Sequence, residues 1–435
     1  MQHLFKEKDK WYLFETDGMH LFKVSGEMND VLDGYTPEQL DVFEKEANKA
    51  DTQVFETMEE ENKGLCERLI LNTTDACNLA CTYCYADEGS YGIETRQVYM
   101  ALETLKEGIT KVLEMYPAGI GMIQFFGGEP LINRKVLQES VLWMETFFKQ
   151  RQLEMPILTM VTNGTLVTDE DISFFNRYFA SITISIDGEK EINDQQRIYR
   201  DSEESVYDRV KEVVLRMKEK DRQFYLALEG TIDDRHIENF KKQGMNSTYH
   251  DLNAFPVDRI HISPVIDSKK EDDPAKCKDY SDFFGDWVDN EFRKNKHNIR
   301  LKNIVHIMEA AKENIVYGNG CGASKTDLAI SVDGDLYPCF MFIGADAYKI
   351  GNVKEPIEDL KNRHDQIRHE ISLAENNTRC NACWLKPLCA KTHGHCIGAR
   401  YLTSSDINQP VERFCKISER VVETSLANAE NEWSV

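Results

Sequence analysis

Between residues 68 and 311, short apolar runs alternate with longer segments of helical spacing. The alternation indicates strands and helices in turn, and strands ordered this way pair in parallel through right-handed crossovers. We therefore expect an α/β fold with a partial (β/α)6 TIM-like barrel, whose site lies at the carboxyl ends of the strands. The predicted strands cover 69–73, 121–126, 156–161, 181–186, 224–228 and 259–263, and helices are expected near 96–115, 131–150, 168–179, 203–219 and 235–243.

The N-terminal residues have a different pattern, which predicts a small module of strands followed by helices. Strands at 10–15 and 19–24 flank Thr16-Asp17-Gly18, because Asp-Gly is a strong hairpin signal. Thr36-Pro37-Glu38-Gln39 is a capping box with proline at the first helical position, so a helix begins there. The run 45–63, rich in Glu and Asn, is expected to be a helix end and an exposed linker.

The composition of the 435 residues excludes several classes of protein. Hydrophobic residues make up 41% and charged residues 29%, which is typical of a globular chain. The net charge of −23 excludes a general basic surface for nucleic acid, because phosphate binding needs an excess of Lys and Arg. No apolar run approaches the length of a membrane span, and the charged start predicts no signal peptide. We expect a cytoplasmic protein with no nucleic-acid and no membrane partner.

Twelve cysteines are too many for packing alone in such a chain, where disulfides are disfavoured and metal binding is favoured. Ten of them fall in two sets, three at 77–84 and seven at 321–415, which leaves Cys66 and Cys277. The first set, C-x3-C-x2-C, follows the first predicted strand. Three thiolates on one loop can hold three irons of a [4Fe–4S] cluster and leave the fourth iron open for a substrate or cofactor.

The spacing of Cys77, Cys81 and Cys84 resembles that of the radical S-adenosylmethionine (SAM) enzymes. In that family the open iron chelates the amino and carboxylate groups of SAM, and reductive cleavage yields a 5′-deoxyadenosyl radical. The resemblance implies an enzyme that uses SAM and an electron donor such as flavodoxin or ferredoxin. It also implies that Tyr83, just before the third cysteine, lies near the adenine.

A polar motif ends the second predicted strand, at the edge where a barrel has its site. Gly127-Gly128-Glu129-Pro130 resembles the radical SAM motif that receives the SAM ammonium group. The two glycines let the backbone come close to a ligand. Glu129 offers a carboxylate to the amine, and Pro130 fixes the turn.

Further family positions are matched after the third and fourth strands. Asn163, Ser185 and Asp187 match contacts of the cofactor, and the strand-four polar group contacts the ribose or the methionyl carboxylate in that family. Thr162-Asn163-Gly164 and Asp187-Gly188 have a second interpretation, since these residue types are also common in turns that bind no ligand. Arg197 follows strand four, as a basic residue does in peptide-modifying relatives, which implies a role in the site. The alternative interpretation is that Arg197 is an exposed arginine on a helix. Glu229 ends the fifth strand, with nothing further in the sequence to support a role.

The seven late cysteines begin with C-x12-G-x4-C, in which Asp333-Gly334 predicts a hairpin that brings Cys339 opposite the segment near Cys321. The whole pattern resembles the SPASM extension of radical SAM enzymes, a domain with two auxiliary [4Fe–4S] clusters. The family usually has three residues in the last interval before Cys396, where this chain has six. The remaining pattern is Cys380-x2-Cys383-x5-Cys389-x6-Cys396, followed by Cys415.

The resemblance implies three [4Fe–4S] clusters in all, one that binds SAM and two auxiliary ones. The inner auxiliary cluster, with three cysteines, has an open iron unless Cys66, Cys277, His393 or His395 completes it. C-x2-C with later Cys and His also suits tetrahedral zinc, which is the alternative. The implied ligands are Cys380, Cys383, Cys389 and Cys415 for the outer cluster, and Cys321, Cys339 and Cys396 for the inner one.

SPASM-bearing relatives mostly modify peptides, which implies a maturase for a ribosomally made precursor peptide with a leader. The radical takes a hydrogen atom from the peptide, a thioether or a Lys–Trp-type carbon–carbon crosslink closes, and the auxiliary clusters accept the surplus electron. The expected domains are a winged-helix-like, leader-recognition module at 1–64, a radical SAM core at 65–312, and a SPASM domain with a C-terminal helix at 313–435.

Two alternatives remain open. An anaerobic sulfatase-maturing enzyme, which generates formylglycine, carries Asp after the second inner-cluster cysteine, where this chain has Phe340. An alternative of another class is a non-catalytic iron–sulfur protein. Such a protein has no need of a G-G-E-P motif, since that motif serves a SAM amine.

Overall fold

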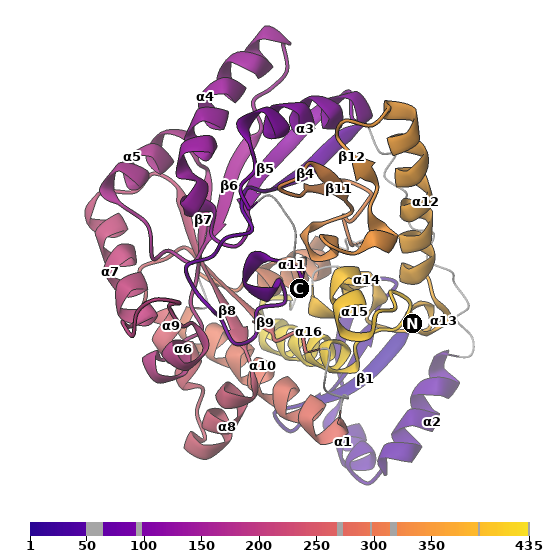
Figure 1. Ribbon diagram of the computed structural model, residues 1–435. Coiled ribbons are helices and arrows are strands. Elements are labelled where there is room, and N and C mark those ends of the chain that lie inside the picture. The colour runs from indigo at the N-terminus through magenta and orange to yellow at the C-terminus, as the bar shows by residue number, and fades with distance from the viewer. Residues whose placement is uncertain are drawn as a thin grey trace.

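The computed structural model describes residues 1–48, 64–92, 98–267, 273–295, 298–313, 320–389 and 392–433. Its centre is a nine-stranded sheet with the order β12-β11-β10-β4-β5-β6-β7-β8-β9 (Figure 1). The six strands predicted from the apolar runs are all parallel and form the partial barrel, so the expected fold class is confirmed. They are β4 (Leu65–Asn72), β5 (Gly119–Phe126), β6 (Ile157–Thr162), β7 (Ser181–Ser185), β8 (Tyr225–Ile232) and β9 (Arg259–Pro264).

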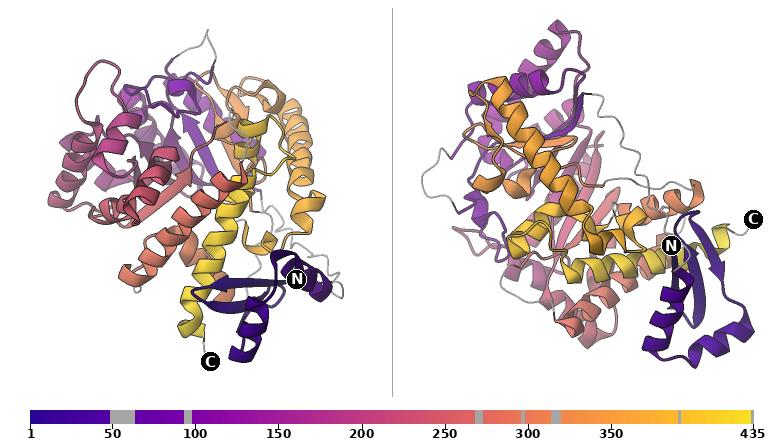
Figure 2. Two further views of the ribbon diagram at one scale, coloured as in Figure 1. Left: turned by 90° about the horizontal axis from the view of Figure 1, so that it is seen from below. Right: turned by 90° about the vertical axis from the view of Figure 1, so that its right-hand side faces the viewer.

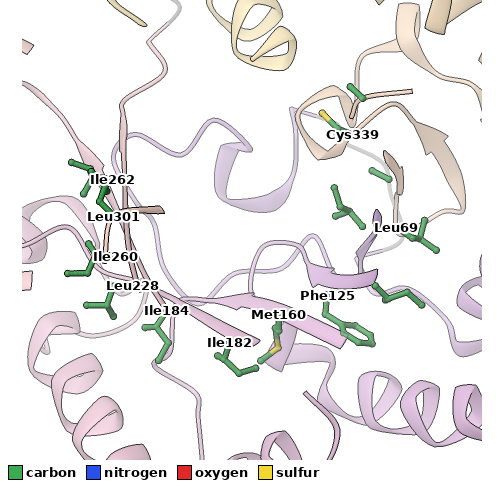
Figure 3. Packing of buried hydrophobic residues seen from close by; sticks show 14 of the residues in the cluster. Leu69, Phe125, Met160, Ile182, Ile184, Leu228, Ile260, Ile262, Leu301 and Cys339 are labelled. Atoms are coloured by element: carbon green, nitrogen blue, oxygen red, sulfur yellow. The ribbon is translucent and has the colours of Figure 1, made fainter. Parts of the chain in front are cut away.

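Side chains alternate across the barrel strands, which places apolar residues on one face and polar residues on the other. Ile182 and Ile184 of β7 and Leu228 of β8 are fully buried, and Figure 3 shows them in a row with apolar residues of neighbouring strands. Thr183 and Ser185, the intervening positions of β7, line a cavity inside the barrel. The pattern that builds the core therefore also gives the barrel a polar interior.

Helices connect the strands and cover the outer face of the barrel (Figure 1). In α7, the Ser205 hydroxyl caps the helix by accepting the Asp208 N–H at 3.0 Å, and apolar residues between Val206 and Met217 are buried. The predicted helix near 96–115 begins later, at Leu102, and its first residues up to 97 lie outside the described residues. The barrel helices are α3 (Leu102–Met115), α4 (Arg134–Gln150), α5 (Asp169–Tyr178), α6 (Lys190–Gln196), α7 (Val206–Glu219), α8 (Asp234–Gln243) and α9 (Ser247–Asn253), followed after β9 by α10 (Pro274–Asn295) and α11 (Lys302–Glu313).

The C-terminal cysteine-rich part extends the barrel sheet. β10 (Asp327–Ile330) pairs in parallel with β4, and β11 (Asp335–Tyr337) and β12 (Gly351–Asn352) continue the sheet in antiparallel. The predicted hairpin is confirmed, with Gly334 at φ +87° in the turn between β10 and β11. The sequence did not predict that this hairpin adds to the barrel edge. The helices that follow are α12 (Ile357–Glu375), α13 (Thr378–Asn381), α14 (Lys386–Cys389), α15 (Ile397–Ser404) and α16 (Glu412–Trp433).

The N-terminal module is a three-stranded antiparallel sheet followed by two helices, α1 (Gly26–Asp33) and α2 (Pro37–Asn48). β2 (Lys10–Glu15) and β3 (His20–Lys23) match the predicted hairpin, and the capping box is confirmed by reciprocal bonds between Thr36 and Gln39. The sequence missed β1 (Gln2–Glu7), because charged residues break up its apolar positions. The predicted linker lies mostly outside the described residues, which stop at 48 and resume at 64.

The module docks on the C-terminal helix, as both views of Figure 2 show. Arg420 of α16 forms an ion pair with the buried Glu7 of β1. His3 stacks on Trp384, with ring centroids 3.7 Å apart. α16 in turn packs along α10, so the first and last segments of the chain meet against the barrel. None of the helices in the described part of the chain combines the length and apolar character needed to cross a bilayer.

Candidate active site

One continuous cavity of about 2210 Å³ lies inside the barrel and extends to the C-terminal cysteines. The polar inner positions of the strands, the loop after β4 and the C-terminal part of the chain form its walls. The cavity therefore joins the first cysteine loop to the late cysteines, which lie more than 230 residues further along the chain. The cysteines that line it are Cys77, Cys81, Cys84, Cys321, Cys380, Cys383, Cys389 and Cys415.

The first cysteine loop is held against the end of α6 and the residues that follow it. The Ala80 and Thr82 N–H groups donate to the carbonyls of Ile198 and Gln196, at 2.7 and 2.9 Å. Two further backbone N–H groups point at sulfur, 3.4 Å from Cys77 Sγ and 3.3 Å from Cys84 Sγ. Such donors stabilise a thiolate, the form that binds iron.

Burial favours the protonated form of two cysteines of this loop in the absence of a metal group. It raises the pKa of Cys77 to about 11 and the pKa of Cys81 to about 12. Binding to iron has to release these protons, because a metal ligand must be deprotonated. The donor set of three partly buried cysteines on one loop fits a cluster with one open iron.

Gly127 and Gly128 pack directly against the cysteine loop. Gly127 has φ +144°, and a Cβ there would lie 2.4 Å from the Thr74 carbonyl oxygen. A Cβ on Gly128 would lie 2.3 Å from the Ala76 carbonyl oxygen. Only glycine fits either position, since backbone cannot yield as a side chain can. The two glycines were expected to let the backbone come close to a ligand. In the structure they also let the end of β5 pack closely against the backbone of the cysteine loop.

Glu129 lies in the wall behind the glycines and is fully buried. Its carboxylate accepts hydrogen bonds from the Leu131 N–H at 3.0 Å, the Thr162 hydroxyl at 2.8 Å and the Asn163 N–H at 2.7 Å. Burial nevertheless raises its pKa. Glu129 therefore ties the end of β5 to the end of β6, and its contact with a SAM amine stays a prediction. Pro130 begins the buried 3-10 turn Pro130–Asn133.

Asp187 and Arg197 form a buried ion pair beside the cysteine loop. Arg197 donates to the two Asp187 carboxylate oxygens through Nε and Nη2, at 3.0 Å each. The Tyr83 hydroxyl donates to Asp187 at 2.6 Å, and the Thr231 N–H donates at 2.8 Å. Arg197 is 8% exposed and lines the cavity, so the alternative of an exposed arginine is wrong.

Asn163, Ser185 and Glu229 face the same cavity. Asn163 Nδ2 lies 3.9 Å from Cys77 Sγ, which puts its amide beside the first thiol. Glu229 pairs in register with Ser185 on β7 and with His261 on β9. Burial raises the pKa of Glu229, and no described residue donates a hydrogen bond to its carboxylate. The only feature of the sequence that indicated a role for Glu229 in the site is that it is a charged residue in an otherwise apolar strand.

The inner cysteines come together despite the long interval before Cys396. The Cys396 thiol acts electrostatically on both Cys321 and Cys339, and burial raises the pKa of all three thiols. Cys396 lies at the start of α15, where its sulfur accepts the Ala399 N–H at 3.4 Å. Residues 390 and 391 of the interval lie outside the described residues. Met341 Sδ is 3.6 Å from Cys396 Sγ.

The four candidates for a further inner ligand lie in different places. His395 bonds to Glu375 at 2.9 Å, and Glu375 also accepts the Cys321 N–H at 3.3 Å, so His395 belongs to the inner set's surroundings. His393 instead lies 3.5 Å from the Ser263 hydroxyl of β9. Cys66 and Cys277 are buried within β4 and α10.

The outer cysteines come from three short segments around α13, α14 and α16. Burial raises the pKa of Cys389 and of Cys415 to about 12, and the thiols of this set also act on one another. The Cys380 sulfur accepts the side-chain amide of Asn377 at 3.4 Å. The four cysteines that were predicted to share the outer cluster are therefore neighbours in the structure.

Within the described ranges, no group of three or more His, Cys, Asp or Glu side chains is placed to hold a single ion. Thiolates on one zinc ion lie about 4 Å apart, because each Zn–S bond is about 2.3 Å. A cubane cluster binds each thiolate through a different iron and so spreads them further. The described residues thus show no preformed site for a single zinc ion, and the assignment of the late cysteines to clusters stays a prediction.

Two family profiles match the chain. The profile described as the radical SAM superfamily covers residues 71–223, and the profile described as an iron–sulfur cluster-binding domain, SPASM, covers residues 321–384. The first range contains the cysteine loop and G-G-E-P. The second contains four of the seven late cysteines.

Named relatives and solved structures resemble the chain over most of its length. The cysteine-type anaerobic sulfatase-maturating enzyme of Clostridium novyi (strain NT) is 25% identical over 333 residues, which are 74% of this chain and 86% of the relative. Native anSMEcpe with bound AdoMet and Cp18Cys peptide has a TM-score of 0.68 at 20% identity, over 85% of this chain and 99% of that one. Streptococcus suis SuiB bound to precursor peptide SuiA has a TM-score of 0.55 at 14% identity, over 94% of this chain and 98% of that one. The two structures establish a shared fold.

Proposed function

Because the chain belongs to the radical SAM superfamily and carries a SPASM domain, we propose that it is a maturase of a ribosomally made precursor peptide. The observation that carries the proposal is the single cavity that joins the cysteine loop to both C-terminal cysteine sets. A crosslinking oxidation needs such a space, because a peptide segment and an electron acceptor must both reach the radical. The product is an intramolecular thioether or carbon–carbon crosslink.

The proposed roles of the residues follow from their positions. Cys77, Cys81 and Cys84 hold the cluster that binds SAM, and the two late sets hold two auxiliary clusters. When bound, SAM supplies a 5′-deoxyadenosyl radical that takes a hydrogen atom from an unactivated carbon. The protein positions the peptide carbon and excludes water, while the chemistry belongs to the cofactor. Asn163, Ser185 and Arg197 face the cavity as cofactor contacts, with Tyr83 and Asp187 fixing Arg197.

The iron content tests the proposed cluster count. Three [4Fe–4S] clusters require about twelve irons per chain after anaerobic reconstitution. The triple variant Cys77→Ala/Cys81→Ala/Cys84→Ala should keep about eight. A wild type with about four irons, none of which survive in the triple variant, would remove the auxiliary clusters from the proposal.

The reaction itself is tested with a short peptide encoded beside the gene, together with SAM and a reductant. We expect 5′-deoxyadenosine and a peptide product lighter by two hydrogen atoms, with the crosslinked residues located by tandem mass spectrometry. The triple cysteine variant is the control and should give neither product. Flavodoxin or ferredoxin should replace the chemical reductant. Failure of the wild type to form 5′-deoxyadenosine with any peptide would count against radical SAM peptide chemistry.

The N-terminal module is proposed to bind the leader of the peptide. β3 is an edge strand, and no other described strand pairs with its outer side. The opposite edge, β1, packs against α16 and α2. Phe22 of β3 is 52% exposed, and Met28 and Val31 of α1, the helix that follows β3 in the chain, are each 49% exposed. A leader that adds a strand there would gain both main-chain bonds and apolar contacts.

Phe22→Asp tests this surface. Burying a phenylalanine side chain is worth about 2 kcal/mol, so the affinity for the leader should fall at least about tenfold. Leu215→Asp is the matched control, since Leu215 is 44% exposed on α7, away from the module. Isothermal titration with the leader peptide measures both. Equal losses in the two variants would mean that β3 is not the leader site.

A second candidate, formylglycine formation on a sulfatase, is favoured by the 25% identity to a sulfatase-maturating enzyme. Phe340 argues against it, because the enzymes of that type carry an acid at this position. Its ring lies 4.8 Å from that of Phe126 and 6.1 Å from that of Tyr85, which makes this part of the cavity apolar. A peptide with the sulfatase cysteine or serine motif distinguishes the two functions, since its conversion to an aldehyde would replace the crosslinking proposal.

A further inference from the structure

Arg400 of α15 is one of the largest fully buried side chains of the protein. It is 2% exposed to solvent and lines the cavity on its C-terminal side. It lies between the two late cysteine sets, since its charge acts on Cys396 of the inner set and its Nη2 reaches Cys380 of the outer set.

The hydrogen bonds of Arg400 do not neutralise its charge. Nη1 donates to the carbonyls of Ala374 and Ile407, at 3.1 and 3.4 Å. Nη2 donates to Cys380 Sγ at 3.5 Å. Nε is buried and has no partner. In the part of the chain that the structure covers, no carboxylate forms an ion pair with Arg400, and a guanidinium stays protonated in a protein.

Another buried arginine, which lies in the barrel wall, has a counter-charge. Arg197 faces Asp187 with two hydrogen bonds of 3.0 Å. Burying a charge without such a partner costs several kcal/mol. A protonated cysteine is neutral, so the nearby thiols by themselves do not provide the missing negative charge.

A [4Fe–4S] cluster with four thiolate ligands does provide it. Such a cluster is anionic, and it gains one more negative charge when it is reduced. A fixed positive charge and an N–H donor beside a ligand sulfur therefore stabilise the reduced form more than the oxidised form. Of the two late sets, the outer one receives this donor directly, through the Cys380 sulfur.

We propose that Arg400 is the counter-ion of the auxiliary clusters and raises the reduction potential of the outer cluster. The inference rests on the proposed auxiliary clusters. Arg400 is a positioning residue in this account, because it acts on the electron acceptor and touches neither SAM nor the peptide. Its effect makes the outer cluster the favoured destination for an electron that leaves the substrate.

Redox titration followed by electron paramagnetic resonance tests the inference, in the Cys77→Ala/Cys81→Ala/Cys84→Ala background that keeps only the auxiliary clusters. Arg400→Gln removes the charge and should lower the ratio of reduced to oxidised outer cluster at a fixed potential about tenfold, which corresponds to about 59 mV for a one-electron couple. Arg400→Lys keeps the charge and should restore most of the shift.

Arg379→Gln is the matched control. Arg379 also acts electrostatically on Cys380, but its side chain is 56% exposed and it already pairs with Glu412. Solvent and the carboxylate screen its charge, so we expect a shift several times smaller than that of Arg400→Gln. Equal shifts in the two variants would overturn the inference, because burial would then have no part in the effect.

Iron content separates failure of this inference from failure of the cluster assignment. A background protein with about eight irons whose potential does not change in Arg400→Gln overturns the role of Arg400 and leaves the clusters in place. A background protein without iron overturns the auxiliary clusters themselves. If Arg400→Gln loses iron and Arg400→Lys keeps it, the need for the charge is supported, whereas equal loss in both variants contradicts it.

Discussion

Asp187 balances the charge of Arg197 inside the barrel wall, and this balance is a property of single residues that mutation can remove. Asp187→Asn keeps the shape of the side chain but leaves the buried guanidinium without a counter-charge. Breaking a buried pair in this way costs about 3–5 kcal/mol. Tyr83→Phe removes only the hydroxyl that donates to Asp187 at 2.6 Å, which costs about 1–2 kcal/mol.

Denaturant unfolding of the two variants measures the difference. We expect Asp187→Asn to lose at least twice the free energy of unfolding that Tyr83→Phe loses, and to bind SAM more weakly because Arg197 and Tyr83 shift. Equal losses would mean that the carboxylate charge is not what holds Arg197. The prediction concerns Asp187 as a support, since its oxygens are occupied by Tyr83, Arg197 and Thr231.

The same residues show what the sequence can and cannot predict at this scale. The order of the motifs predicted Tyr83, Asp187 and Arg197 as site residues. It did not predict that Tyr83 and Arg197 both donate hydrogen bonds to Asp187. Periodicity gives the face of a strand, whereas partners across different loops depend on how the loops close. For Glu229 the sequence is sufficient, because the alternation of side chains along a strand already places its side chain toward the interior of the barrel.

At the scale of elements, the end of β5 fixes the loop after β4. Gly127→Ala adds a methyl group 2.4 Å from the Thr74 carbonyl, at φ +144°, so the loop has to move. We expect the variant to lose the irons of the first cluster and to fall from about twelve to about eight per chain. Gly26→Ala is the matched control, because nothing lies within 4 Å of the added methyl group.

Iron analysis of the two variants after reconstitution decides the matter. Full iron content in Gly127→Ala would show that the loop tolerates the displacement, and the close packing would then have no role in cluster binding. The strand runs that predicted β4 to β9 were sufficient for the barrel. They did not predict β1 or the addition of β10 to β4, because both depend on pairing with distant edges and not on a local apolar pattern.

At the scale of the whole molecule, the N-terminal module and the C-terminal helix are joined by a partly buried histidine. His3 Nδ1 lies 2.7 Å from Glu44 of α2, and Nε2 lies 2.9 Å from Glu423 of α16. Burial alone would lower the pKa of His3, but the hydrogen bonds to Glu423 and Glu44 outweigh it and raise the pKa to about 9. The same ring stacks on Trp384, which follows the outer-set Cys383 in the sequence.

This pKa predicts a pH dependence of docking with a definite sign. A histidine whose pKa is higher in the folded protein stabilises the fold fully below its usual pKa of 6.5, and the stabilisation is lost as the pH rises through about 9. The shift corresponds to up to about 3 kcal/mol. The difference in free energy of unfolding between the wild type and His3→Gln should therefore be largest near pH 6 and shrink toward pH 10, when both are measured as holoenzymes in urea.

His20→Gln provides the comparison, because His20 is an exposed histidine of β3 with a single carboxylate neighbour, Glu15, at 3.2 Å. Because this pair is exposed to solvent, His20→Gln should change the free energy of unfolding by no more than about 0.5 kcal/mol. A His3→Gln difference that is constant from pH 6 to pH 10 would show that His3 acts through stacking on Trp384 and not through its charge. A difference that follows the titration instead makes the attachment of the proposed leader module to the cluster-bearing domain depend on one proton.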